Sequence, residues 1–213
     1  FVIGYAYDDR WKTMTVKDFI KRRVIRLHPM VVMGAVIGAV MFYFQGCPVW
    51  DVTKVTVAAL LLATFVNALL IPATPGTEIR GLGEMYPLNG PSWSLFFEYI
   101  GNILYALIIR KFSTKALAVL VVAAGCGLAA FSIFGPYGDI CAGFSLTGTE
   151  FTGGFFRLLY AFSAGLLLSR VFRPARVRGA FWKCSLLVII LLAVPRLGGA
   201  DRLWMNGLYD TVC

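Results

Sequence analysis

Long apolar runs dominate this chain and limit what it can fold into. A helix needs about 20 residues to cross a hydrocarbon core of ~30 Å. Five runs approach that length, at residues 30–44, 55–71, 93–109, 116–134 and 155–171. A sixth run, 181–194, is shorter, and the two ends, 1–7 and 203–213, look like parts of further helices. We therefore predict an all-α fold, a polytopic transmembrane helix bundle with about six to eight membrane segments.

The composition supports a membrane protein over a soluble one. Hydrophobic residues make up 59% of the chain and charged residues only 15%, with a mean hydropathy of +0.76. A soluble domain carries about 25% charged residues, so this chain lacks the polar surface to cover a soluble core. The chain starts without Met, inside an apolar run, and shows no signal peptide. We expect a single integral membrane domain over residues 1–213 that is truncated at both ends.

The net charge of +9 is concentrated in three groups, within residues 12–26, 110–115 and 170–183. Short loops rich in Lys and Arg face the cytoplasm, where they also attract anionic lipid. Strict alternation of the apolar runs conflicts with this rule, because run 93–109 would then end outside. Either the rule fails in the second half, or the connection 72–91, rich in Pro and Gly, holds a re-entrant segment.

The cysteines give little sign of a metal or redox site. None of the five forms a CxxC pair, and one His is too few for a usual zinc site. We therefore expect no metal. Cys47 and Cys141 fall in the two loops expected to face outward, and a disulfide between them is an open alternative.

A cationic segment stands before the first long run, where residues 21–29 read KRRVIRLHP. Arg23 and Arg26 are three residues apart, so on a helix they lie on one face. Each guanidinium offers a planar fork of donors that suits phosphate oxygens. Together they could clamp a pyrophosphate or a 3′-phosphate. The alternative is a membrane anchor that binds lipid headgroups, with Pro29 at the start of the helix.

A second feature places a carboxylate inside an apolar run, where residues 91–99 read PSWSLFFEY. Pro91 suits the start of a helix, and Ser92 or Ser94 could cap its first turn. Ser94 and Glu98 are four residues apart and share a face. A carboxylate in an apolar helix is costly without a partner or a cavity. Glu98 therefore either bridges to an Arg or belongs to a polar site within the membrane region.

The third feature is Arg157, near the start of run 155–171. Its guanidinium either reaches out to water, pairs with Glu98, or lines the same cavity. The small residues 163–165 that follow permit close helix packing.

The order of these three features resembles the acyltransferase-3 family of integral membrane O-acyltransferases. That family has RxxR followed by a hydrophobic residue, an aromatic and Pro, for which residues 23–29 read RVIRLHP here. It has a WSLxxE element, matched by residues 93–98, and a later RxxxxFxxG helix, matched by Arg157, Phe162 and Gly165. The resemblance covers most of the chain and departs from the pattern at His28, where members often have Tyr.

The resemblance implies a protein of about ten helices that moves an acyl group from cytoplasmic acyl-CoA to a hydroxyl. It implies acetyl-CoA as co-substrate, with no permanently bound cofactor, and a saccharide or lipid-linked acceptor at the cell surface. We expect the bilayer of a bacterial inner membrane around the protein, and no nucleic-acid partner. The candidate residues are Arg23 and Arg26 for the donor, Trp93 and Arg157 for the cavity, and Glu98 and Ser94 in support of catalysis.

The catalytic His of the family lies on its first helix, which would precede residue 1. His28, the one histidine of the chain, stands at the interface beside RxxR rather than in a pocket opposite Glu98. We assign it no catalytic role, and we expect the polypeptide as given to lack transferase activity.

Two other function classes stay open from the residues alone. A transporter or flippase of a lipid-linked saccharide would show paired repeats, and we find no internal repeat. A non-catalytic membrane scaffold would leave Glu98 and Arg157 as a structural bridge.

Overall fold

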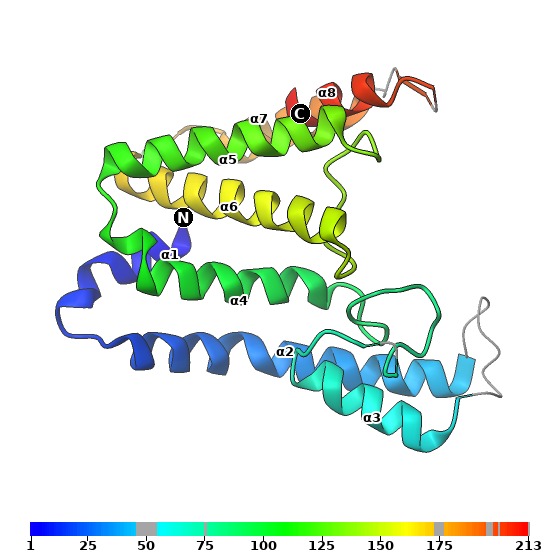
Figure 1. Ribbon diagram of the computed structural model, residues 1–213. Helices are drawn as coiled ribbons and strands as arrows, with labels where there is room; N and C mark the ends of the chain where they lie inside the picture. The colour runs from blue at the N-terminus through cyan, green and yellow to red at the C-terminus, as the bar shows by residue number, and fades with distance from the viewer. Residues whose placement is uncertain (46–54, 75, 173–176, 195–197, 200, 213) are drawn as a thin grey trace. The chain divides into compact units, whose positions relative to one another are not determined.

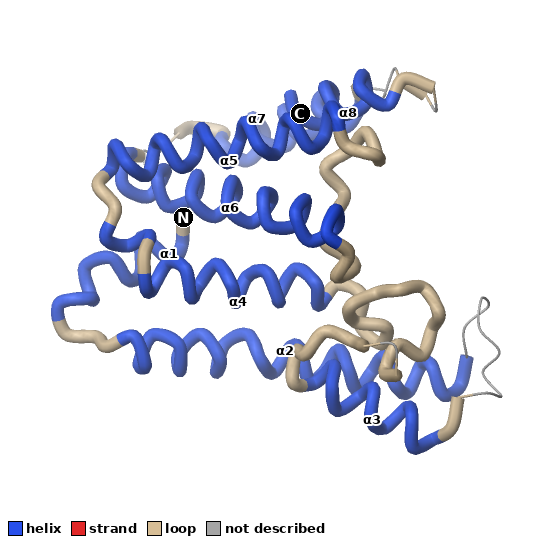
Figure 2. The backbone as a smooth tube through the Cα atoms, in the orientation of Figure 1, coloured by secondary structure: helices blue, strands red, loops and turns tan. Residues whose placement is uncertain are grey.

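The computed structural model describes residues 1–45, 55–74, 76–172, 177–194, 198–199 and 201–212. Across these ranges every regular element is helical, which confirms the predicted all-α fold (Figure 1, Figure 2). The α-helices are α1 (Val2–Tyr7), α2 (Val16–Gln45), α3 (Val57–Ala68), α4 (Ser92–Leu107), α5 (Thr114–Phe134), α6 (Gly148–Val171), α7 (Ala180–Ala193) and α8 (Leu203–Val212). Short 3-10 helices cover Asp8–Lys12 and Ile109–Lys111. The possible Cys47–Cys141 disulfide lies outside the described residues, because Cys47 is not among them.

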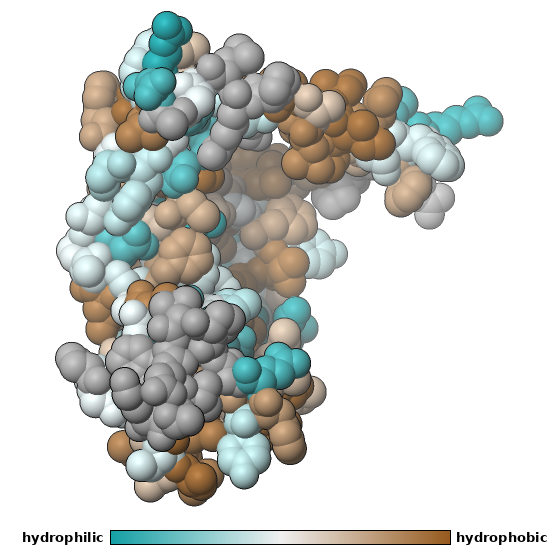
Figure 3. Space-filling model, turned by 90° about the vertical axis from the view of Figure 1, so that its right-hand side faces the viewer, coloured by the Kyte–Doolittle hydropathy of each residue, from teal (hydrophilic) through white to brown (hydrophobic). Residues whose placement is uncertain are grey.

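Three of these helices, α2, α5 and α6, are long and apolar enough to cross a membrane. Many of their large hydrophobic side chains point outward, such as Val119, which is 69% exposed. Hydrophobic residues accordingly cover large areas of the surface in Figure 3. Lipid tails accept such side chains without cost, so a transmembrane helix bundle is confirmed.

Helix α2 begins earlier than the sequence suggested. It is one helix of 30 residues that carries the cationic segment, and Pro29 lies inside it rather than at its start. Thr15 and Asp18 fix the beginning by a reciprocal cap: the Thr15 hydroxyl donates to Asp18 Oδ2 at 2.6 Å, and the Asp18 N–H donates to Thr15 Oγ1 at 3.2 Å. The helix continues through Pro29 at the loss of one backbone bond, the one that Ile25 would otherwise accept.

The chain divides into two compact units, which we describe separately. The α2 unit comprises residues 9–111 and 142–158. In it, α3 and α4 both pack on α2. A core of Phe42, Leu60, Ala63, Ile79 and Leu88 joins α2, α3 and the connection 69–91 (Figure 1).

Glycines on α2 let the connection 69–91 lie directly against the helix. A Cβ at Gly38 would overlap the backbone oxygen of Leu88, and a Cβ at Gly34 would overlap the side-chain amide of Asn89. The hydrogen atom of glycine is therefore what allows helix and connection to touch.

Helix α3 is shorter than the apolar run that contains it. Leu70 takes a left-handed conformation with φ 57°, which stops the helix. Tyr86 donates to the Leu70 carbonyl at 2.9 Å and holds the turn. Burial raises the pKa of Tyr86, so its hydroxyl keeps the proton that it donates.

The length of α3 bears on the count of membrane crossings. Twelve residues rise about 18 Å, which is short of the ~30 Å hydrocarbon core. Run 55–71 therefore does not hold a full spanning helix.

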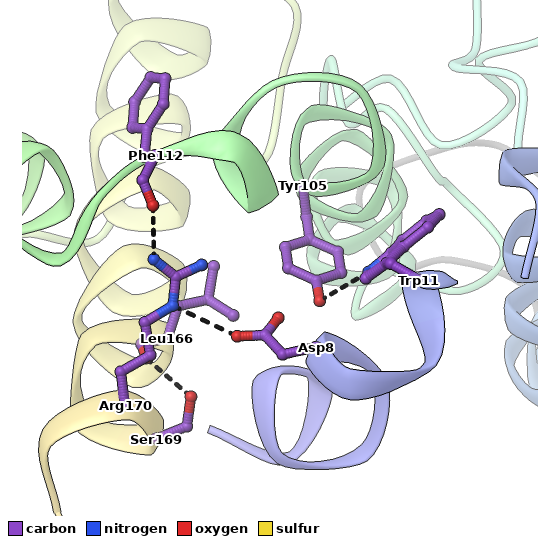
Figure 4. Close-up of polar contacts among 7 residues, drawn as sticks. All are labelled: Asp8, Trp11, Tyr105, Phe112, Leu166, Ser169 and Arg170. Carbon is purple, nitrogen blue, oxygen red and sulfur yellow. Dashed lines mark hydrogen bonds and ion pairs between the residues drawn. The ribbon is translucent and has the colours of Figure 1, made fainter. Parts of the chain in front are cut away.

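The α5 unit comprises residues 1–8, 112–141 and 159–213. Helix α8 packs on α5, and Ser132 Oγ donates to the Gly207 carbonyl at 3.1 Å. Arg170 at the end of α6 donates to Asp8 Oδ2 at 3.2 Å and to the Phe112 carbonyl at 2.7 Å (Figure 4). Arg170 thus ties the start of this unit to the residues before α5.

Candidate active site

An ion pair between α2 and α4 is the most buried charge interaction described. Arg23 Nη2 donates to Glu98 Oε1 at 2.5 Å. The Arg23 side chain is only 4% exposed, whereas that of Glu98 is 36% exposed. The sequence left open whether Glu98 bridges to an Arg, and the structure shows that it does, with Arg23 as the partner.

Unpaired polar atoms surround this ion pair. Arg23 Nε, Tyr99 Oη and Asn102 Oδ1 are buried and have no hydrogen-bond partner among the described residues. Tyr99 and Asn102 are three residues apart and lie on one face of α4, and the charges of Arg23 and Glu98 both act on the Tyr99 hydroxyl. We call Arg23, Glu98, Tyr99 and Asn102 the polar cluster.

The polar cluster has spare capacity to bind a ligand. Leaving a buried polar group unpaired costs about 1–3 kcal/mol, so three such atoms favour an occupant that pairs them. Arg23 Nε offers a donor, Asn102 Oδ1 an acceptor, and the Tyr99 hydroxyl can act as either. An amide, a hydroxyl or a carbonyl group would meet complementary partners here.

Arg23 and Arg26 occupy different environments although they are one turn apart. Arg23 is buried in the polar cluster, and Arg26 is exposed, as are Lys21 and Arg22 beside it. Arg26 makes no ion pair or hydrogen bond with another described residue. The exposed cations Lys21, Arg22 and Arg26 are the ones that an anion in water can reach.

The serines at the start of α4 do not cap it. Pro91 occupies the N-cap position without a side-chain bond, and Ser92 is buried within the first turn. The predicted cap by Ser92 or Ser94 is therefore wrong, because the helix already begins at Ser92 and both serines lie inside its first turn. Ser94 is exposed, and its hydroxyl donates to the Pro91 carbonyl at 2.8 Å rather than to Glu98.

Arg157 lies against Trp93, and the possible pairing of Arg157 with Glu98 is wrong. The guanidinium sits over the Trp93 ring at 4.8 Å from its centroid and donates to the Ala142 carbonyl at 3.1 Å. Trp93 also packs edge-on against Phe144, with ring centroids 5.1 Å apart. These two predicted cavity residues therefore meet, and together they support the segment 142–147.

Sequence reasoning missed Tyr99 and Asn102. The sequence did contain a signal for them, because Tyr99 directly follows Glu98 and Asn102 lies one turn later in a largely apolar helix. Asn102 also donates to the Glu98 carbonyl at 2.7 Å, which fixes its amide and leaves Oδ1 as the unpaired atom. Polar residues one turn from a carboxylate within a membrane helix are candidates for the same site.

Comparison with known proteins shows the family of the chain. The family model described as "Acyltransferase domain" matches residues 1–212. "Protein 2 in picA locus" of Rhizobium radiobacter is 32% identical over 113 residues, which are 50% of this chain and 58% of that protein. This chain thus spans somewhat more than half the length of that relative, and no solved structure matches. The chain belongs to the acyltransferase-3 family of integral membrane proteins.

Proposed function

We propose that the protein is a membrane-bound O-acyltransferase of the bacterial inner membrane. It moves an acyl group, with acetyl as the first choice, from cytoplasmic acyl-CoA to a hydroxyl of a saccharide or another cell-surface acceptor. The observation that carries the proposal is the polar cluster, which lies between α2 and α4 in a chain that belongs to an acyltransferase family.

The exposed cations of α2 support a donor site beside the cluster. Coenzyme A carries several phosphate charges, and Arg binds phosphate oxygens through two parallel bonds. Arg26 is exposed and lies one turn from Arg23, whose guanidinium faces the cluster. Phosphates held at Arg26 would leave the thin pantetheine arm to extend along α2 toward the cluster. An amide N–H of that arm suits Asn102 Oδ1 as acceptor.

The reaction exchanges one bond for another at the acyl carbon. The acceptor hydroxyl forms the new C–O bond, the C–S bond of the thioester breaks, and the hydroxyl proton ends on the released thiol. Negative charge develops on the carbonyl oxygen, and a fixed donor such as the Arg23 Nε–H stabilises it in a dry site. Glu98 orients Arg23 through their ion pair, and we assign no general base among the described residues.

The test measures acyl-CoA binding to the purified protein in detergent. Arg26→Ala should weaken acetyl-CoA binding by about 5- to 10-fold, as for loss of one charge-assisted contact of ~1–1.5 kcal/mol. Lys111→Ala, which removes an exposed cation outside the proposed donor site, is the control and should have little effect. Equal affinities of Arg26→Ala and wild type would remove the donor site, and wild type without acyl-CoA binding would overturn the function.

A further inference from the structure

A cavity of about 520 Å³ opens between two loop segments of the α2 unit. One wall comes from the connection between α3 and α4, with Thr74, Glu78, Glu84 and Met85, and the other from Ser145 and Thr147 before α6. Its volume lies within the ~300–1,000 Å³ that is usual for small-molecule sites. None of the residues of the polar cluster lines it.

A backbone bond at Met85 joins the two walls: the Met85 N–H donates to the Phe144 carbonyl at 2.8 Å. Within the first wall, the Met85 carbonyl accepts from the Ala73 N–H at 2.7 Å. Glu150 in the first turn of α6 accepts from the N–H groups of Gly143 and Phe144, at 2.8 and 3.2 Å. The cavity is thus fixed by the fold without a ligand.

The lining combines hydroxyls, carboxylates and apolar side chains. Hydroxyls come from Thr74, Ser145 and Thr147, and Ala73 and Leu146 supply apolar surface. Carboxylates form strong, charge-assisted bonds with hydroxyl donors, and apolar side chains suit the C–H face of a sugar ring. This mixture fits a molecule rich in hydroxyl groups.

The charge of the cavity is negative. Arg80 stands nearby, but its Nη1 donates to Glu84 Oε2 at 3.1 Å and to the Pro87 carbonyl at 3.3 Å. That ion pair balances Glu84. Among the residues that the structure describes, Glu78 has no cationic partner and accepts only the backbone N–H of Arg80, at 3.0 Å. Like charges disfavour each other at short range, so an anionic ligand would be repelled.

The cavity lies toward the opposite end of α2 from the polar cluster. The connection that forms its first wall touches α2 at Gly34 and Gly38. Gly38 is 15 residues beyond Arg23, which corresponds to about 22 Å along a helix. A ligand there would approach from the membrane face opposite the cationic segment.

We propose that this cavity binds the acyl acceptor and selects uncharged, polyhydroxylated acceptors over anionic ones. The proposal rests on the proposed function and adds to it a site and a charge preference. Glu78 is the residue that rejects anions, and the hydroxyls of Thr74, Ser145 and Thr147 bind the acceptor together with it.

The experiment compares glycan binding by wild type and Glu78→Gln in detergent. The probes are a panel of neutral oligosaccharides and a matched panel in which hexose units are replaced by uronic acids. Wild type should bind members of the neutral panel and reject the matched uronates. Glu78→Gln keeps the size of the side chain and an oxygen for the Arg80 N–H, so the fold is retained. It should lower the preference for neutral over anionic members by about 10-fold or more. Asp9→Asn, a neutralised exposed carboxylate outside the cavity, is the control and should keep the wild-type preference.

The outcomes separate this inference from the proposed function. Binding of acetyl-CoA by the same preparations reports on the donor site and should be equal in wild type and Glu78→Gln. Three results would contradict the acceptor site but not the proposed function, provided that acetyl-CoA still binds. They are a failure of all neutral glycans to bind, tighter binding of uronates than of neutral glycans, and an unchanged preference in Glu78→Gln. If acetyl-CoA does not bind to wild type, the proposed function fails.

Discussion

The two ends of the α2 unit carry charge in contrasting ways. At one end the charges sit on helices: Arg23 and Glu98 pair between α2 and α4, and the pair is largely buried on the Arg23 side. At the other end they sit on loops, where Arg80 and Glu84 are about one-third exposed. Helices satisfy their own backbone, so their side chains are left to bind, whereas loops must first find partners for their N–H and carbonyl groups. The same fold therefore offers a side-chain site at one end and a backbone-built cavity at the other.

The largest expected effect is a difference between the two ion pairs in their contribution to the free energy of unfolding. Glu98→Ala leaves a guanidinium that is 4% exposed without its partner. The loss should approach the ~3–5 kcal/mol of a broken buried pair, reduced by the exposure of Glu98. Glu84→Ala breaks the exposed pair and should cost about 1 kcal/mol or less. Thermal unfolding in detergent measures both, and equal shifts of Tm would show that burial of Arg23 has no energetic consequence.

The glycines of α2 should show how tightly the connection 69–91 is seated. Gly38→Ala places a methyl group against the backbone oxygen of Leu88, which cannot move alone. We expect a loss of about 1–3 kcal/mol, as for an overpacked core. Gly34→Ala meets the end of the Asn89 side chain, which can rotate away, so its loss should be smaller. Thermal unfolding ranks the two variants, and a larger loss for Gly34→Ala would contradict the described contact.

Glu150 should stabilise the second wall of the cavity locally more than it stabilises the fold as a whole. Glu150→Ala removes the acceptor of two backbone N–H groups and should cost about 1–2 kcal/mol locally. Hydrogen exchange of the peptide that spans residues 142–147 should become faster. Peptides from α5, which belongs to the other unit, are the internal reference. Unchanged exchange in segment 142–147 would mean that Glu150 does not secure it.

Of the four sets of substitutions, those of Arg157 should change the stability of the protein least. Its contact with the Trp93 ring is a cation–π interaction, which contributes about 0.5–1 kcal/mol at partly exposed sites. Arg157→Lys keeps the charge but loses the planar stack, and Arg157→Met loses both. A shift of tryptophan fluorescence should accompany the second change more than the first. Identical spectra for all three proteins would place Trp93 away from residue 157.

Much of the fold follows from the sequence, and the exceptions have physical causes. Apolar runs located most helices, and Pro91 marked the start of α4. The start of α2 was misplaced because Pro29 resembles a helix start, whereas the cap at Thr15 and Asp18 lies in a polar stretch without an apolar run. The end of α3 depends on a left-handed Leu70, a conformation that local propensity does not predict.

Arg23 and Glu98 of the candidate site were predicted from the sequence, whereas Tyr99, Asn102 and the burial of the cluster were not. Helical spacing correctly placed Arg23 and Arg26 one turn apart. It could not show that only Arg23 pairs with a carboxylate. Periodicity tells on which side of a helix a residue lies, but not which residue of another helix packs against it. The cavity could not be predicted at all, since its walls are 60 or more residues apart in the chain and are joined by backbone bonds that no side-chain pattern records.

The backbone bond between Met85 and Phe144 has a consequence for the kinetics of ligand binding. The Met85 N–H fastens the first wall to Phe144, and Glu150 in turn fastens the second wall at Gly143 and Phe144, so the cavity is held open from both sides. A ligand would therefore enter a site that exists beforehand, without a preceding or following rearrangement. Its observed association rate should rise linearly with ligand concentration and show no plateau in rapid-mixing experiments.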